Sequence, residues 1–190
     1  MSEPFTRSYR ASWGQMDFNA HMANTAYLDL AADTRLMYFE ESGFSPRDFE
    51  RERIGPVVMR DEISYRAEVR LLDRVTVSLA LAGLSEDGSR FRLRNGFQRD
   101  DGRTAAVVTT DAGWFDLEQR RLCAPPEALR RALAELPRTG DFEPLPSSLR
   151  GAGDGRCSGF CSSSCAERRS TRPRPSSTSW AWAGGSTRAT

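Results

Sequence analysis

The sequence contains no lysine, since all 27 of its basic residues are arginine, and it has a single histidine in 190 residues. It also has no run of about 18 apolar residues, which is the length that a membrane-spanning helix needs. The first residues lack the apolar segment and the small-residue cleavage site of a signal peptide. From these absences we expect a soluble, cytoplasmic protein with no membrane partner.

Charge is distributed unevenly along the chain. Residues 151–190 hold six arginines and two acidic residues, so they carry a net charge of +4 within a total of +1. The first 150 residues therefore carry a net charge of −3. Such a body lacks the excess of basic residues that nucleic-acid binding usually needs, and we expect no nucleic-acid partner.

The composition changes abruptly near residue 150. From Gly151 onward there is no isoleucine, leucine, valine or methionine. Little apolar area is then available to offset chain entropy, so a disordered, low-complexity tail is expected over residues 151–190. A further hypothesis is that this tail is an out-of-frame reading of GC-rich DNA. The expected organisation is a folded domain over residues 1–140, a linker over 141–150 and the tail.

Cysteine usage gives no framework for disulfides or metal. Three cysteines lie in the tail at a spacing of four, Cys157, Cys161 and Cys165, and Cys123 stands alone in the body. Zinc sites usually combine such residues with a distant second cysteine pair or with histidines, and no second cluster exists. We therefore expect no metal site, and the pattern fits a reducing compartment.

One long helix is predicted after residue 23. Apolar residues recur at helical spacing from Tyr27 to Tyr38. Asn24 is a residue type that caps helix N-termini, and Gly43 can adopt the left-handed conformation that ends a helix near Ser42.

Downstream of this helix the apolar period changes to two, which is typical of half-buried strands. Turn residues, Ser85-Glu-Asp-Gly88 and Arg99-Asp-Asp-Gly102, separate them. Pro125 and Pro126 open a short helix that reaches Leu136. A sheet that buries one face on the long helix is an α+β layer, and its uncovered edges predict a homodimer at least. Extended segments are expected over residues 57–70, 75–81, 91–97 and 105–115.

The stretch Asp17-Phe-Asn-Ala-His21-Met-Ala-Asn24 places a carboxylate, the only histidine and a helix-opening asparagine between a strand and the long helix. With Trp13-Gly-Gln-Met before it, Thr-Ala-Tyr27 after it and the order of elements, it resembles the hotdog-fold 4-hydroxybenzoyl-CoA thioesterase family over roughly residues 5–138. The resemblance implies a hotdog fold, an antiparallel sheet wrapped around one long central helix. It also implies an acyl-CoA thioesterase that forms homodimers or homotetramers and needs no cofactor.

The resemblance also implies roles for individual residues. Asp17 would be the catalytic carboxylate, acting on the thioester as nucleophile or on water as general base. His21 would orient Asp17 or the attacking water, or contact the thioester, and its structural alternative is to tie down the loop. Asn24 would contribute mainly its backbone N–H to an oxyanion site. Because arginine forks suit phosphates, Arg60, Arg92 and Arg94 are candidates for binding CoA, with a solvated strand face as the alternative.

Two other functions stay open. A hotdog enoyl-CoA hydratase also uses an aspartate and a histidine at a strand-to-helix turn, but typically five apart with a proline between them, whereas Asp17 and His21 are four apart. The second is a non-catalytic hotdog module that binds acyl-CoA, because fold alone does not fix function. A serine triad is excluded, since His21 has no Gly-x-Ser-x-Gly partner.

Overall fold

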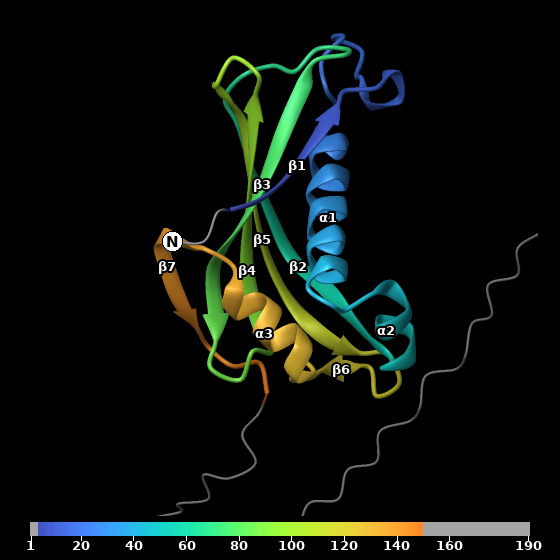
Figure 1. The fold of residues 1–190 in the computed structure, drawn as a ribbon, viewed down its shortest axis with the longest axis vertical. Helices are drawn as coiled ribbons and strands as arrows, with labels where there is room; N and C mark the ends of the chain where they lie inside the picture. The colour runs from blue at the N-terminus through green and yellow to red at the C-terminus, as the bar shows by residue number, and fades with distance from the viewer. Residues whose placement is uncertain (1–3, 150–190) are drawn as a thin grey trace, which may run out of the picture. The chain divides into compact units, whose positions relative to one another are not determined.

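A seven-stranded sheet curls around helix α1 (Asn24–Glu41) in the computed structural model, which describes residues 4–149 (Figure 1). The strands of the main path pair antiparallel with their neighbours, in the order β1 (Phe5–Arg10), β3 (Arg74–Ser85), β4 (Arg90–Arg99), β5 (Thr104–Asp116) and β2 (Ile54–Tyr65). Two shorter pairings extend it: β6 (Arg121–Leu122) lies against β5, and β7 (Arg138–Leu145) runs parallel to β3. The α+β layer expected from the sequence is present.

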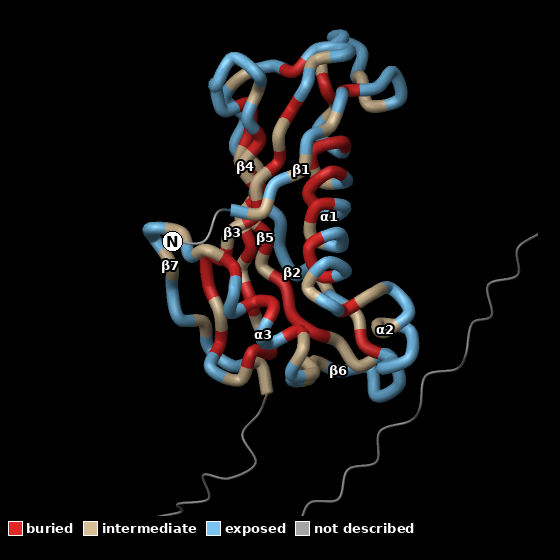
Figure 2. The backbone as a smooth tube through the Cα atoms, in the orientation of Figure 1, coloured by how far each residue is buried: buried red, intermediate tan, exposed pale blue. Residues whose placement is uncertain are grey.

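The sheet buries the face that lies against α1. Successive strand side chains point to opposite faces, so β3 and β4 alternate between buried and partly exposed residues. Arg92 and Arg94 are among the partly exposed ones, and in Figure 2 the centre of the sheet is largely buried whereas the loops at both ends are exposed. The buried side chains of the two strands include Val75, Val77, Leu79, Leu81, Phe91, Leu93 and Phe97.

Helix α1 ends where the sequence predicts, in a Schellman motif. Gly43 adopts a left-handed φ of 88°, and its N–H donates to the Glu40 carbonyl at 3.0 Å. The N–H of Phe44 donates to the Phe39 carbonyl at 2.8 Å, and the Phe44 ring is buried under the last turn. These bonds satisfy carbonyls that a helix end would otherwise leave without donors.

The start of α1 differs from the expectation. Ala23 occupies the N-cap position, and no side chain caps the helix there. Asn24 is the first helical residue, and its Oδ1 accepts a hydrogen bond from the N–H of Thr25 at 2.9 Å. The expected N-cap role of Asn24 is therefore wrong by one position.

Several expected boundaries also shift. The segment expected over 57–70 is one strand, β2, that ends at Tyr65, and the expected short helix is α3 (Glu127–Glu135). A further short helix, α2 (Pro46–Arg51), was not predicted. Strand β7 carries regular structure to Leu145, so part of the expected linker over 141–150 belongs to the sheet. The predictions for the tail over 151–190 lie outside the described residues.

Strand β2 forms one end of the sheet path and pairs on one side only within the described residues. A register shift between Val58 and Arg60 bends it, and it carries exposed apolar side chains at Val58, Met59 and Tyr65. None of the helices in the described part of the chain is long and apolar enough to cross a membrane.

Candidate active site

Asp17 sits at the start of a tight loop that projects where α1 begins (Figure 1). Met16 and Met22 form an antiparallel bridge, and the N–H of Asp17 donates to the His21 carbonyl at 2.8 Å. Ala20 has a positive φ of 60°, and its N–H donates a hydrogen bond to the Asp17 carbonyl at 3.1 Å. The four-residue spacing of Asp17 and His21 is thus the spacing of a closed backbone loop.

The Asp17 carboxylate is exposed and is held through one of its two oxygens. Its Oδ1 accepts hydrogen bonds from the N–H of Asn19 at 2.8 Å and of His21 at 3.1 Å. The His21 N–H is the main reason that the pKa of Asp17 lies below its ordinary value of 3.8, with desolvation acting in the opposite direction and Asn19 assisting. The carboxylate is therefore ionised at neutral pH. The Asn19 side chain also helps to lower the pKa of Asp17. Both backbone N–H groups bind Oδ1, so Oδ2 is the oxygen left to act.

The His21 imidazole points to a residue that the sequence did not single out. Its Nε2 lies 3.1 Å from Oε2 of Glu68, in the connection between β2 and β3, and both side chains are partly exposed. Within residues 4–149 His21 contacts Asp17 through its backbone and not through its ring. No local sequence pattern marked Glu68 as a site residue, because it lies in a charged connection that comes close to His21 only in the folded protein.

The first turn of α1 lies beside this loop. The N–H of Ala23 donates to the Gln15 carbonyl at 2.8 Å, which ties the helix start to the short 3-10 turn Trp13–Gln15. The backbone N–H of Asn24 has no acceptor in the described part of the chain, as is usual in a first helical turn. In the same segment Trp13 and Phe18 are largely or wholly exposed, so these two rings are left uncovered by the described residues.

The three candidate arginines lie together but away from this loop. Arg60, Arg92 and Arg94 line a hollow of about 230 Å³ that spans the adjacent strands β4, β5 and β2. None of them contacts Asp17, His21 or Asn24 among the described residues. Each is paired with a carboxylate: Arg60 with Glu62 at 2.7 Å, Arg92 with Asp111 at 2.6 Å and Arg94 with Asp141 at 2.7 Å.

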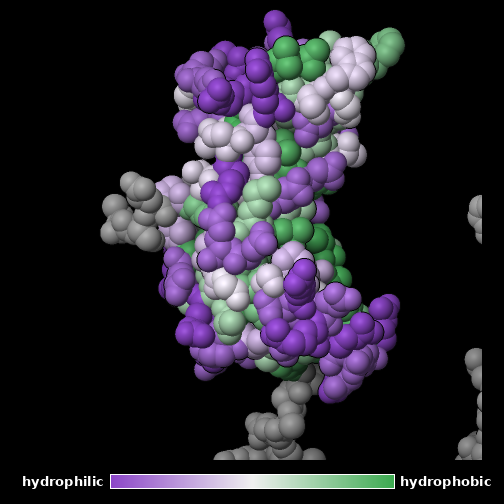
Figure 3. Space-filling model, turned by 45° about the vertical axis from the view of Figure 1, so that its right-hand side comes forward, coloured by the Kyte–Doolittle hydropathy of each residue, from purple (hydrophilic) through white to green (hydrophobic). Residues whose placement is uncertain are grey.

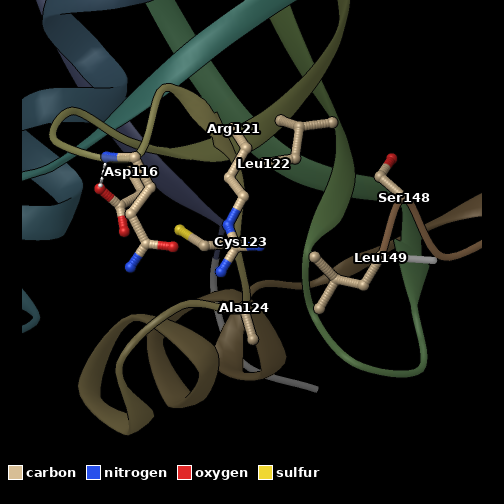
Figure 4. A pocket seen from close by; sticks show the side chains of 8 residues that line it. Asp116, Arg121, Leu122, Cys123, Ala124, Ser148 and Leu149 are labelled. Carbon is tan, nitrogen blue, oxygen red and sulfur yellow. Dashed lines mark hydrogen bonds between the residues drawn. The ribbon is translucent and has the colours of Figure 1, made fainter. Parts of the chain in front are cut away.

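Another hollow, of about 670 Å³, lies between β6 and the segment Ser148–Leu149 (Figure 4). Cys123 lines it, and burial raises the pKa of this thiol, so the thiol stays protonated and is a poor nucleophile. Neither Asp17 nor His21 lines this hollow. Residues 4–149 also hold no group of three or more His, Cys, Asp or Glu residues placed to bind a metal ion.

A family model described as the thioesterase-like superfamily matches residues 11–133. The chain belongs to this superfamily. The match covers the Asp17 loop, α1 and the five strands β2 to β6 of this thioesterase-like protein.

A curated relative is 30% identical over 133 residues, the L-carnitine dehydrogenase/betainyl-CoA thioesterase of Agrobacterium fabrum. The aligned part is 70% of this thioesterase-like chain and spans only about a quarter, 27%, of the relative's length. The expected enzyme class, a thioester hydrolase, is the class of the superfamily and of this relative.

Solved structures share the fold at low sequence identity. A Staphylococcus aureus protein in complex with CoA has a TM-score of 0.65 and 21% identity, covering 79% of this chain and 90% of its own. A 1,4-dihydroxy-2-naphthoyl-CoA thioesterase from Synechocystis has a TM-score of 0.64 and 15% identity, covering 70% and 98%. The expected hotdog fold of this thioesterase-like protein is confirmed.

Proposed function

We propose that this protein hydrolyses an acyl-CoA thioester to a free carboxylic acid and CoA, with Asp17 as the acting carboxylate. The observation that carries the proposal is the state of Asp17: an ionised, exposed carboxylate with Oδ1 fixed by two N–H groups and Oδ2 unused. Membership of the thioesterase-like superfamily supports the reaction class.

The chemistry can follow either of two routes through Oδ2. As a nucleophile, Oδ2 attacks the thioester carbonyl carbon, the C–S bond breaks, and water then hydrolyses the resulting anhydride. As a general base, Oδ2 takes a proton from a water molecule that attacks the same carbon. In both routes the sulfur leaves as a thiolate and is protonated to the CoA thiol.

The first turn of α1 supplies the proposed oxyanion site. Negative charge develops on the thioester oxygen during the attack, and a backbone N–H without an acceptor stabilises such charge. The N–H of Asn24 has this property, and the positive end of the helix dipole adds to it. Loss of one donor of this kind typically costs about 3–4 kcal/mol of transition-state stabilisation.

The His21 and Glu68 pair holds the loop in this proposal. The imidazole bonded to Glu68 anchors the loop to the β2–β3 connection, which is also joined by the Met22 N–H bond to the Val69 carbonyl at 2.8 Å. The loop then presents Oδ2 of Asp17 in one orientation. This assigns His21 a positioning role, while the Asn24 side chain has none beyond its bond to Thr25.

We also propose that the active protein is a homodimer or homotetramer. Strand β2 pairs with β5 on one side, and its other edge, beside the exposed Val58, Met59 and Tyr65, pairs with no strand among the described residues, so a second copy of the chain can extend the sheet there. Sedimentation velocity should give a mass of at least two chains. A single species with the mass of one chain contradicts this part of the proposal.

The substrate is proposed to be a CoA thioester, with betainyl-CoA as the first acyl group to test because the Agrobacterium relative is named for it. Purified protein is incubated with a panel of acyl-CoA and enoyl-CoA esters while free thiol and enoyl absorbance are followed. Release of thiol supports hydrolysis. Loss of enoyl absorbance without thiol identifies a hydratase, and CoA binding with neither change identifies a binding module.

A further inference from the structure

A second arginine cluster lies at the same end of the molecule as the Asp17 loop. Arg66 and Arg70 belong to the β2–β3 connection, and Arg99 and Arg103 belong to the β4–β5 hairpin, and Figure 1 shows both segments at this end. Together the four line a hollow of about 630 Å³. This volume is in the range of ordinary ligand pockets. In Figure 3 hydrophilic residues cover one side of this end of the molecule, and hydrophobic residues lie beside them.

The hollow adjoins the proposed active site. Glu68 lines it and is the residue whose carboxylate lies 3.1 Å from the His21 imidazole. The backbone of His21 also forms an antiparallel bridge with Arg70. The hollow is therefore joined to the Asp17 loop through two residues that line it, Glu68 and Arg70.

The hollow lined by Arg66, Arg70, Arg99 and Arg103 has more arginines than the carboxylates around it can neutralise. Arg70 pairs with Glu68 at 2.5 Å, and Arg103 pairs with Asp101 at 2.7 Å. Arg99 lies 4.0 Å from Asp73 and 3.5 Å from Asp101. The remaining arginine, Arg66, is exposed, and its side chain makes no hydrogen bond or ion pair within residues 4–149. Four guanidinium groups thus face three carboxylates.

The hollow on β4, β5 and β2 has the opposite balance of charge. Its three arginines, Arg60, Arg92 and Arg94, meet four carboxylates, namely Glu62, Asp111, Asp141 and Glu143. An anion entering it would have to displace carboxylates that already hold the arginines. An anion entering the hollow at Arg66 meets a guanidinium that is already available.

We propose that the hollow lined by Arg66, Arg70, Arg99 and Arg103 binds the phosphate groups of CoA. This inference rests on the proposed function, because it takes a CoA thioester as the ligand. Guanidinium groups bind phosphate oxygens through paired N–H bonds. The first 150 residues carry a net charge of −3, so a local excess of arginine is what draws a polyanionic substrate to this end of the protein.

The test is binding of free CoA, measured by isothermal titration on the full chain and on Arg66→Gln. Loss of one charge-assisted hydrogen bond should weaken binding of CoA about tenfold. Arg131→Gln is the matched control, because Arg131 is an exposed arginine of α3 far from the hollow along the fold, and it should bind CoA like the wild type. Dephospho-CoA distinguishes the 3′-phosphate from the pyrophosphate as the group that Arg66 holds.

A kinetic comparison separates this inference from the proposed function. The preference for an acyl-CoA over the N-acetylcysteamine thioester of the same acid, expressed as a ratio of kcat/KM values, should fall about tenfold in Arg66→Gln. Equal CoA binding by Arg66→Gln and the wild type overturns the phosphate site, and so does an equal loss in Arg131→Gln. CoA binding that depends on Arg66, without hydrolysis of either thioester, overturns the proposed function alone.

Discussion

Replacing Asp17 by asparagine separates the chemical role of this residue from its role in the loop. The carbonyl oxygen of an asparagine can accept the two N–H bonds that Asp17 Oδ1 now receives from Asn19 and His21. The loop should therefore keep its shape, while the second oxygen is replaced by an NH₂ group that can neither attack nor take a proton. A general base contributes about 10²- to 10⁴-fold to a rate, and the variant should lose this factor in kcat.

The assay is steady-state release of CoA thiol by wild type and Asp17→Asn at neutral pH, with CoA binding and thermal melting as controls. CoA binding and melting temperature should stay close to the wild-type values. Asp17→Ala should lose the same rate and, because it removes the Oδ1 acceptor, should also lower the melting temperature. Hydrolysis within threefold of the wild type in a folded Asp17→Asn protein would refute the reasoning.

The lowered pKa of Asp17 adds a pH dependence with a definite sign. Because the carboxylate is ionised above its lowered pKa, Asp17 should cause no decline in rate between neutral pH and its ordinary value of 3.8. The hydrogen bonds to Oδ1 favour the ionised form, so their contribution to stability is present above the unfolded-state pKa and is lost as pH falls through the folded-state pKa. The measurement is the pH dependence of the hydrolysis rate in wild type and Asp17→Asn. If the wild-type rate falls with acid at a pH well above 4, and this fall is missing in Asp17→Asn, the assignment is contradicted.

Three further predictions test the loop and the fold. Glu68→Gln breaks a partly exposed pair and should change kcat/KM by less than about fivefold, and a loss as large as that of Asp17→Asn would make the pair catalytic. Gly43→Ala should lower the unfolding free energy by about 1 kcal/mol in urea because of its φ of 88°, whereas Gly140→Ala, in open space at ordinary φ, should not. Phe39→Ala should lower the unfolding free energy, measured in the same way, by about 3–5 kcal/mol, because this buried ring packs edge-on against Trp114 with 5.5 Å between the ring centroids. A loss below about 1 kcal/mol would contradict that packing.

Features set by local chemistry could be predicted from the sequence. The end of α1 follows from Gly43 and Phe44, which form a Schellman motif from residues adjacent in the chain. The strands β3, β4 and β5 follow from two-residue alternation, and their turns follow from Ser85–Gly88 and Arg99–Gly102. Each of these signals lies within a dozen residues.

Features set by long-range contacts could not be predicted. The sequence of strand β7 lacks the two-residue alternation of apolar and polar residues, and few of its side chains are buried. The strand is held instead by its parallel pairing with β3. Glu68 meets His21 because the Met22 N–H bond to the Val69 carbonyl and the backbone bridge of His21 with Arg70 hold the β2–β3 connection against the loop. Arg66 and Arg103 share a hollow although they come from different connections.

The arginines of the sheet face also depend on partners that are distant in the sequence. Alternation correctly put Arg92 and Arg94 on one face of a strand, but the sequence could not show that Asp111 and Asp141 already hold them. Free and neutralised arginines look alike until their partners are known.

The central claim, that this protein hydrolyses acyl-CoA thioesters through Asp17, is tested most directly by multiple-turnover thiol release from betainyl-CoA and short-chain acyl-CoA esters, with wild type and Asp17→Asn side by side. The wild type should release many equivalents of thiol per chain from at least one ester, and Asp17→Asn should do so at a rate lower by about 10²- to 10⁴-fold. Absence of thiol release from every ester by a folded wild-type protein that binds CoA would contradict this claim.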